Sequence, residues 1–206
     1  MRRVLGGLYE PPPLPDDPPV RYVIDIGGGI GDFACWVYKQ YAGQVFIDSY
    51  EPHPQAVELY RHNGPPGSAV HPMAVTSAGE GATLRVGADW NGSSLDPALG
   101  PRSGAGVAVS TIHPQHLHTA DLLKIDAPGS EVDILTHYAH LPHVGVVMVR
   151  WYCEHERASV ERLCAAAGLR LFKSIHEHVS RGLQIWIRSR AIQYAGKYTM
   201  PVSVAP

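Results

Sequence analysis

The stretch Val23-Ile24-Asp25-Ile26-Gly27-Gly28-Gly29-Ile30-Gly31 decides the fold, because an apolar run ends there in an acid and a glycine-rich loop. The β-rich residues 21–26 predict a short strand, and apolar residues at helical spacing predict a helix over residues 31–42. Glycine permits backbone angles that other residues avoid, and it lets a ligand approach the main chain closely. The loop therefore predicts a ligand site at the carboxyl end of the first strand of an open α/β sheet.

Strand and helix patterns alternate along most of the remaining sequence. Further strands are expected at residues 45–50, 69–75, 122–125, 144–151, 169–175 and 183–187, and further helices at residues 54–62, 130–140 and 157–167. This alternation predicts a mostly parallel sheet with helices on both faces. The last two strands are joined by a short turn containing Gly182, so they must be antiparallel. We expect an α/β, Rossmann-like, seven-stranded sheet with one antiparallel strand at the C-terminal end.

The length of 206 residues, 45% of them hydrophobic, favours a single domain over residues 1–206. Residues 1–19 are proline-rich and predict an extended lead-in. Residues 76–119 are rich in glycine and serine, with short β-like pieces at 82–86 and 107–112, and they predict an inserted hairpin with loops. Residues 189–206 form a tail whose role the sequence leaves open.

The overall composition argues against several classes of protein. A formal net charge of −2 does not favour binding to nucleic acid through phosphate contacts. The three cysteines show no CxxC spacing, which argues against structural disulfides and thiolate zinc sites. There is no signal peptide pattern and no apolar run approaching the roughly 18 residues of a membrane span. We therefore expect a cytoplasmic, soluble protein with no membrane partner.

The glycine loop is compatible with two classes of ligand, a dinucleotide and S-adenosylmethionine. The dinucleotide fingerprint G-x-G-x-x-G/A can be fitted as Gly29, Gly31 and Ala34, a short match that is weak by itself. In the other interpretation, Asp25 faces the loop and holds the amino acid part of S-adenosylmethionine. That ligand carries no pyrophosphate, so a carboxylate beside it is tolerable, whereas a carboxylate would repel a pyrophosphate. The charge argument favours the methyl donor.

Glu51 directly follows the second predicted strand, about twenty residues beyond the loop. An acid at this position can accept hydrogen bonds from both ribose hydroxyls of a nucleoside. Such charge-assisted bonds contribute about 1.5–3 kcal/mol. The same spacing suits NAD, so Glu51 indicates a nucleoside without choosing the cofactor.

Four segments, in order along the chain, resemble the motifs of the FkbM-type S-adenosylmethionine-dependent methyltransferases. They are Val23–Phe33, Tyr50-Glu51-Pro52-His53-Pro54, Ala74-Val75, and Leu122-Leu123-Lys124-Ile125-Asp126-Ala127-Pro128-Gly129-Ser130-Glu131. The resemblance implies the class I methyltransferase fold and transfer of a methyl group to a hydroxyl of a sugar or secondary metabolite. The cofactor-binding residues it implies are Asp25, Gly27, Gly29, Gly31, Glu51, Pro52, Ala74 and Val75. The sequence departs from the family at Pro128, where the family usually has glutamate.

Three residues are candidates for the chemistry of methyl transfer. A hydroxyl acceptor must lose a proton, and a positioned base helps. Asp126 ends the fourth predicted strand of the sheet and is the first candidate for a base or an acceptor-orienting group. Glu131 either points into the same site or favours the start of the following helix. His155 follows the next strand, in the run Trp151-Tyr152-Cys153-Glu154-His155-Glu156, and is the second candidate base because its ordinary pKa is near neutrality.

The twelve histidines include small clusters, but none has a recognisable metal-enzyme pattern, and we expect no metal. The expected partner is a small-molecule or glycan acceptor, and the oligomeric state is left open. Two other functions remain as alternatives. An NAD-dependent oxidoreductase rests on the dinucleotide match alone, and a non-catalytic S-adenosylmethionine-binding module is suggested by Pro128.

Overall fold

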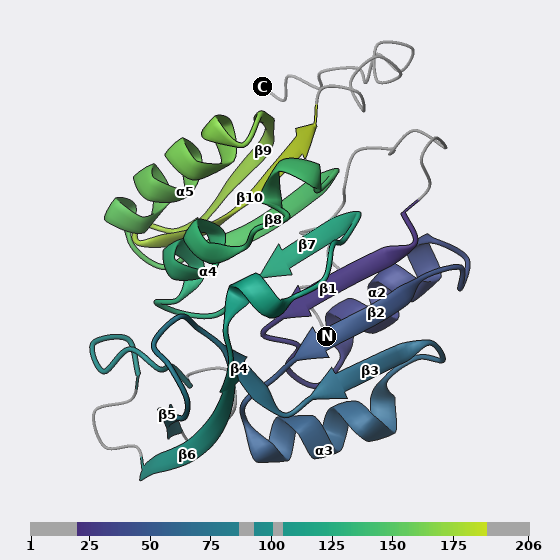
Figure 1. The fold of residues 1–206 in the computed structure, drawn as a ribbon, viewed down its shortest axis with the longest axis vertical. Coiled ribbons are helices and arrows are strands. Elements are labelled where there is room, and N and C mark those ends of the chain that lie inside the picture. Colours follow the sequence, from purple (N-terminus) through teal and green to yellow (C-terminus); the bar gives the residue numbers. More distant parts are fainter. Residues whose placement is uncertain (1–19, 87–92, 101–104, 189–206) are drawn as a thin grey trace, which may run out of the picture.

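The computed structural model describes residues 20–86, 93–100 and 105–188 (Figure 1). The predicted lead-in at residues 1–19 and the tail at 189–206 lie outside the described residues. The strands are β1 Tyr22–Ile26, β2 Phe46–Tyr50, β3 Ser68–His71, β4 Met73–Val75, β5 Ala82–Val86, β6 Ala105–Ile112, β7 Leu122–Ile125, β8 Val146–Trp151, β9 Leu169–His178 and β10 Arg181–Arg188. The helices are α2 Asp32–Gln40, α3 Pro54–Asn63, α4 Glu131–His137 and α5 Glu154–Ala166, with short 3₁₀ turns η2 Pro114–His116 and η3 Leu141–His143.

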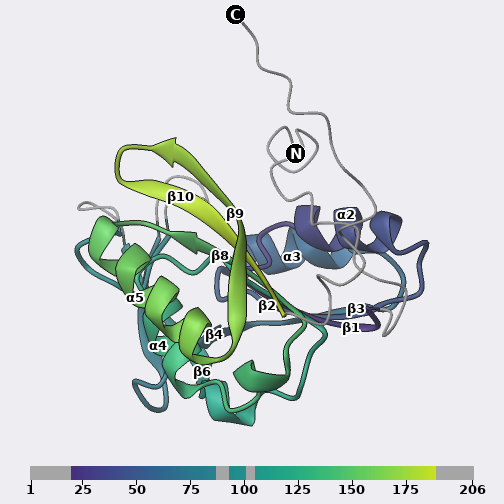
Figure 2. The same ribbon diagram turned by 90° about the horizontal axis from the view of Figure 1, so that it is seen from above.

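The main sheet has seven strands in the order β3-β2-β1-β7-β8-β10-β9. Strand β10 is antiparallel to both of its neighbours, whereas the other pairs are parallel. Helices α2 and α3 cover one face and α4 and α5 cover the other (Figure 2). The predicted Rossmann-like α/β architecture, with one antiparallel strand at the C-terminal end, is confirmed.

The two central strands, β7 and β8, are buried along their whole length. Parallel strands with helices on both faces have this continuous burial. One apolar cluster, including Leu123 and Val147, lies on one side of the sheet, and a second, including Leu122 and Met148, lies on the other. Each such side chain contributes about 1.5–3 kcal/mol when buried. The carboxyl ends of these strands are therefore firmly supported positions for functional groups.

The chain between β3 and β7 forms a smaller sheet in the order β4-β6-β5. Strands β5 and β6 pair antiparallel, and β4 pairs parallel to β6. Figure 1 shows this smaller sheet beside the ends of β2 and β3. The prediction of one strand over residues 69–75 was wrong, because β3 ends at His71 and β4 begins at Met73. Pro72 separates them, since proline has no N–H to continue a sheet ladder.

Two helix boundaries also differ from the prediction. Helix α4 ends at His137, three residues before the predicted end at residue 140. Pro142 prevents further helix, because its ring would clash with the carbonyl four residues earlier. Helix α5 begins at Glu154 instead of residue 157, because Glu156 accepts hydrogen bonds from the N–H groups of Tyr152 and Cys153 and so caps the first turn.

Gly182 lies within β10 and not in the predicted turn. A Cβ atom added there would stand 2.3 Å from the carbonyl oxygen of Ile175 and 2.7 Å from the Trp151 ring. Close backbone approach therefore explains this glycine. None of the helices in residues 20–86, 93–100 and 105–188 is long and apolar enough to cross a membrane.

Candidate active site

The glycine loop is wedged between the ends of β2 and β7. The N–H groups of Gly27 and Gly28 both donate to the carbonyl oxygen of Tyr50, at 2.9 and 3.2 Å. Gly27 has φ +78°, and a Cβ added to it would lie 2.0 Å from the carbonyl oxygen of Asp126. Gly29 has φ +55°, and an added Cβ would meet nothing within 4 Å. The loop is therefore packed tightly against the backbone of Asp126 at Gly27, and it has open space beside it at Gly29.

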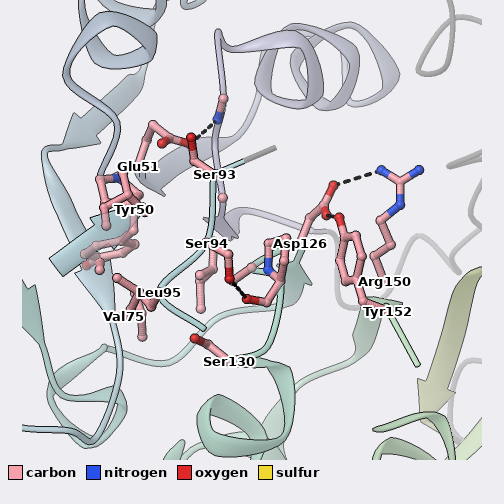
Figure 3. Close-up of a pocket in the computed structure, with 18 of the residues that line it drawn as sticks. Tyr50, Glu51, Val75, Ser93, Ser94, Leu95, Asp126, Ser130, Arg150 and Tyr152 are labelled. Carbon is pink, nitrogen blue, oxygen red and sulfur yellow. Dashed lines mark hydrogen bonds and ion pairs between the residues drawn. The ribbon is translucent and has the colours of Figure 1, made fainter. Parts of the chain in front are cut away.

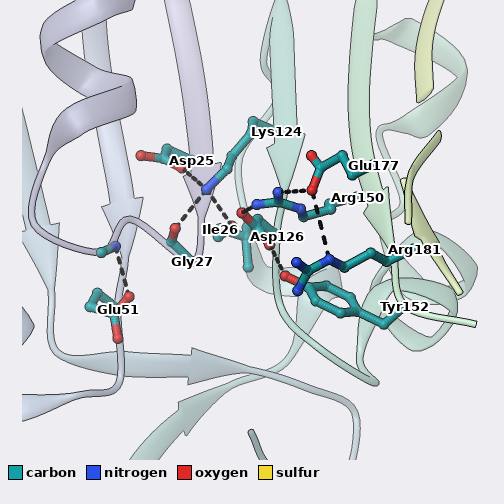
Figure 4. A network of polar contacts seen from close by, with 11 residues as sticks. Asp25, Ile26, Gly27, Glu51, Lys124, Asp126, Arg150, Tyr152, Glu177 and Arg181 are labelled. Carbon is teal, nitrogen blue, oxygen red and sulfur yellow. Dashed lines mark hydrogen bonds and ion pairs between the residues drawn. The ribbon is translucent and has the colours of Figure 1, made fainter. Parts of the chain in front are cut away.

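Asp25 is completely buried and forms an ion pair with Lys124, with 2.9 Å between Oδ1 and Nζ (Figure 4). The Ser49 hydroxyl donates to its other oxygen at 3.2 Å. The Lys124 ammonium also donates to the carbonyl oxygen of Gly27 at 2.6 Å. Asp25 is not among the residues that line the cavity described below. Asp25 holds the glycine loop in place through Lys124.

Glu51 holds the opposite side of the loop. One carboxylate oxygen accepts the N–H of Gly29 at 2.8 Å, and the other accepts the N–H of His53 at 2.8 Å. The residue is 8% exposed. Burial raises the pKa of the Glu51 carboxyl, although the two N–H groups and the Lys124 cation lower it in part. The acid that follows β2 is thus preorganised at the mouth of the loop.

A cavity of about 150 Å³ lies at the carboxyl ends of β1, β2 and β7. Figure 3 shows Tyr50 and Glu51 on one side, Asp126, Arg150 and Tyr152 on the other, and Ser94 and Leu95 between them. The predicted residues that line it are Gly27, Gly29, Glu51, Pro52, Ala74, Val75 and Asp126. Further lining residues are Tyr50, Met73, Ser93, Ser94, Leu95, Pro128, Ser130, Arg150, Tyr152 and Arg181.

Asp126 stands at the end of β7 with both carboxylate oxygens engaged. Tyr152 donates its hydroxyl to Oδ1 at 2.5 Å, and Arg150 donates to Oδ2 at 3.1 Å. Burial raises the pKa of Asp126. The cations of Lys124 and Arg150 and the Tyr152 hydroxyl lower it by more, so the pKa lies below its ordinary value. Asp126 is therefore a stable carboxylate at neutral pH and a weak proton acceptor.

The structure does not bring the other two catalytic candidates to the cavity wall. Glu131 is completely buried at the start of α4, and it accepts the N–H of Gly129 at 3.0 Å. Burial, with repulsion from Glu156, raises the pKa of Glu131 well above its ordinary value. His155 is exposed in the first turn of α5 and is not among the residues that line the cavity. Gly31 caps α2 and packs near the Tyr60 ring, also away from the cavity.

Several residues of the site were missed from the sequence. Lys124 carried a signal, because a charged residue in the buried strand Leu122–Ile125 needs a partner. The residues Ser93, Ser94 and Leu95 come from the insertion, and the Ser94 hydroxyl donates to the carbonyl oxygen of Pro128 at 2.6 Å. No pattern in the sequence around either residue predicts this hydrogen bond, because Ser94 and Pro128 are far apart along the chain. Tyr152, directly after β8, lines the cavity, whereas Trp151, the last residue of β8, is completely buried.

The histidines form no metal centre among the described residues, where no three His, Cys, Asp or Glu side chains are placed to hold an ion. Some of them have other partners. Asp48 accepts hydrogen bonds from the ring nitrogens of His71 and His118, at 2.9 and 2.7 Å. The rings of His113 and His137 meet edge to face. These histidines lie outside the cavity.

No protein-family model matches the chain, and no curated protein matches it. Solved structures are similar in fold. Fibrillarin from Aeropyrum pernix, in complex with natively bound S-adenosyl-L-methionine, has a TM-score of 0.53 at 11% identity, covering 89% of this chain and 72% of that one. Precorrin-6y C5,15-methyltransferase from Geobacter metallireducens has a TM-score of 0.52 at 12% identity, covering 90% and 85%. An O-methyltransferase family protein from Burkholderia thailandensis has a TM-score of 0.51 at 12% identity, covering 91% and 57%. At these identities the likeness shows a shared fold alone.

Proposed function

We propose that the protein is an S-adenosylmethionine-dependent methyltransferase that methylates a hydroxyl oxygen of a small molecule, a sugar or secondary metabolite. One observation carries this proposal. The Glu51 carboxylate, the open face of Gly29 and the Asp126 carboxylate line one cavity, at the ends of three adjacent parallel strands. Ligands of open α/β sheets bind at that edge. The fold shared with known methyltransferases supports the same conclusion.

The lining residues fit the proposed cofactor. Gly29 lines the cavity, and a Cβ added there would meet nothing within 4 Å, so a ligand can approach the main chain at this position. Glu51 provides carboxylate oxygens for ribose hydroxyls, and Pro52, Ala74 and Val75 provide apolar surface for a flat base. When bound, S-adenosylmethionine supplies a methyl group on a positively charged sulfur. The role of Asp25 in this proposal is indirect, because it holds Lys124 and the Gly27 carbonyl in place.

Asp126 and Tyr152 are the residues proposed to meet the acceptor. Methyl transfer requires in-line alignment, so a fixed hydrogen-bonding group beside the acceptor oxygen contributes much of the catalysis. Asp126 is held by Arg150 and Tyr152, and its lowered pKa keeps it charged. We assign it the role of orienting the acceptor hydroxyl. Neither Glu131 nor His155 lines the cavity, and the proposal gives them no direct role.

The hydroxyl as acceptor rests on the resemblance to the FkbM-type family. At Pro128, where the family usually has glutamate, the backbone carbonyl accepts the Ser94 hydroxyl and the residue lines the cavity. The position thus joins the insertion to the end of β7. Because the contact uses the backbone carbonyl, it does not depend on the side chain at position 128.

Calorimetry with S-adenosylhomocysteine tests cofactor binding. We expect Glu51→Ala to weaken binding by about tenfold or more, because charge-assisted hydrogen bonds to ribose are lost. The control is Glu58→Ala, which removes an exposed acid from α3. Equal affinities of the two variants would remove Glu51 from the nucleoside site. Transfer of a labelled methyl group to a mixture of glycans and metabolites, lost in Asp126→Ala, would argue against a binding module without turnover.

The dinucleotide alternative uses the same loop. Of the three positions fitted to that fingerprint, Gly29 lines the cavity, Gly31 packs on Tyr60, and Ala34 is completely buried in α2, where the third position of the fingerprint packs the helix against the sheet. Titration of the protein with NADH, followed by nucleotide fluorescence, separates the two cofactors. Tight NADH binding without binding of S-adenosylhomocysteine would support an oxidoreductase.

A further inference from the structure

Two arginines, Arg150 and Arg181, lie at the end of the cavity proposed to hold the acceptor, and they differ in exposure and in ion pairing. The Arg150 side chain is 9% exposed, and its guanidinium contacts Asp126 on one side and Glu177 on the other. Arg181 begins β10 and lines the same cavity. Figure 4 shows its guanidinium beside Tyr152 and Glu177. These groups come from the adjacent strands β7, β8, β10 and β9, so the sheet itself brings them together.

Arg181 forms one long ion pair among the described residues, and it shares that acid with Arg150. Its nearest acid among the described residues is Glu177, with 4.0 Å between Nε and Oε2, and that same carboxylate oxygen already contacts Arg150. The Nε atom of Arg181 is buried and has no hydrogen-bond partner in the described part of the chain. A buried donor without a partner costs free energy. The side chain is 40% exposed overall, and it lines the cavity.

We infer that Arg181 receives a carboxylate of the methyl acceptor, so that the substrate is an acidic small molecule. The inference rests on the proposed function, because it takes this end of the cavity as the acceptor side. A guanidinium presents donors in a planar fork that matches a carboxylate in two parallel hydrogen bonds. A neutral sugar would leave the fork without a charged partner.

The charge around Arg181 limits how much negative charge a ligand can bring. Asp126 and Glu177 carry two negative charges, and Arg150 and Arg181 carry two positive charges. A carboxylate adds one negative charge, beside the arginine whose nearest acid is 4.0 Å away and shared with Arg150. A phosphate monoester carries more charge at neutral pH and would place it near two existing carboxylates. The carboxylate is therefore the better match.

Ligand-observed fluorine NMR with 4-fluorobenzoate and 4-fluorobenzamide tests the inference, because the two probes share a shape and differ in charge. We expect the acid to bind more tightly than the amide, and Arg181→Met to weaken binding of the acid by about tenfold or more. Arg170→Met, which removes an exposed arginine from the far part of β9, is the matched control. Thermal unfolding of each variant checks that it is folded.

Three results would overturn the inference: equal binding of acid and amide, unchanged binding of the acid by Arg181→Met, or no binding of the acid at millimolar concentration. Each titration is repeated with and without S-adenosylhomocysteine. If that nucleoside fails to bind while the acid still depends on Arg181, the proposed function fails and the anion site stands. If the nucleoside binds but the acid has no preference, the function stands and the acidic substrate is excluded.

Discussion

Replacing Lys124 with methionine tests the buried ion pair that anchors the glycine loop. The side chains of Lys124 and Asp25 are 4% and 0% exposed, and Nζ lies 2.9 Å from Oδ1. Removing one partner of a buried ion pair costs about 3–5 kcal/mol, because the other charge stays buried without compensation. The loss of the hydrogen bond to the Gly27 carbonyl adds about 1 kcal/mol. Since small domains unfold with about 5–15 kcal/mol, Lys124→Met should remove a large fraction of the stability.

Urea unfolding at neutral pH, followed by tryptophan fluorescence, measures this effect for Lys124→Met, Asp25→Asn and the double variant. We expect the double variant to be more stable than Lys124→Met alone, because it leaves no unpaired charge in the interior. Calorimetry should show weaker binding of S-adenosylhomocysteine to Lys124→Met, since the loop loses its support. A cost below about 1 kcal/mol for Lys124→Met would refute the reasoning, and so would a double variant that is no more stable than the single one.

Three further substitutions give separate predictions. Gly27→Ala should destabilise the protein by about 2–5 kcal/mol in urea unfolding, because of left-handed backbone strain and overlap with the Asp126 carbonyl. Gly29→Ala has only the backbone strain and should cost about 1–2 kcal/mol. Equal costs for the two variants would contradict the loop geometry. Tyr152→Phe removes a hydrogen bond that favours the charged form of Asp126, so the pKa of that carboxyl should rise in a carbon-13 NMR titration, and an unchanged pKa would argue against the contact. The folded-state pKa of Glu131 lies above its unfolded value, so its stabilising contribution is complete below the unfolded pKa of about 4.3 and is lost as pH rises toward the folded pKa. Glu131→Gln does not ionise, so the stability of this variant relative to the unchanged protein should increase as pH rises above about 4.3. A stability difference that does not change with pH would contradict the raised pKa of Glu131.

The order of strands and helices could be predicted because its signals are local. Apolar runs such as residues 144–151 are long enough to identify buried strands, and the short connection between the last two strands fixes one as antiparallel. The errors also have local causes. Pro72 ends β3 early, and the cap formed by Glu156 starts α5 early. Both boundaries depend on a single residue, and the spacing of apolar residues gives no information about its effect.

The side of the cavity proposed to hold the cofactor was more predictable than the side proposed to hold the acceptor. Gly29 and Glu51 lie in short motifs that follow consecutive strands, so their meeting follows from the fold. The pairing of Asp25 with Lys124 depends on the register between β1 and β7, in which these two residues are partners. Arg181 reaches the cavity only because β10 returns antiparallel beside β8. Contacts set by register between distant segments are not visible in the sequence of either segment.

One cavity is proposed to hold the nucleoside at Glu51 and to present its sulfur to Asp126 and Tyr152. A crystal structure with S-adenosylhomocysteine tests this directly. We expect ribose hydroxyls within hydrogen-bonding distance of the Glu51 carboxylate and the sulfur on the side of the cavity formed by Asp126. A nucleoside bound elsewhere, or bound with its ribose away from Glu51, would contradict it.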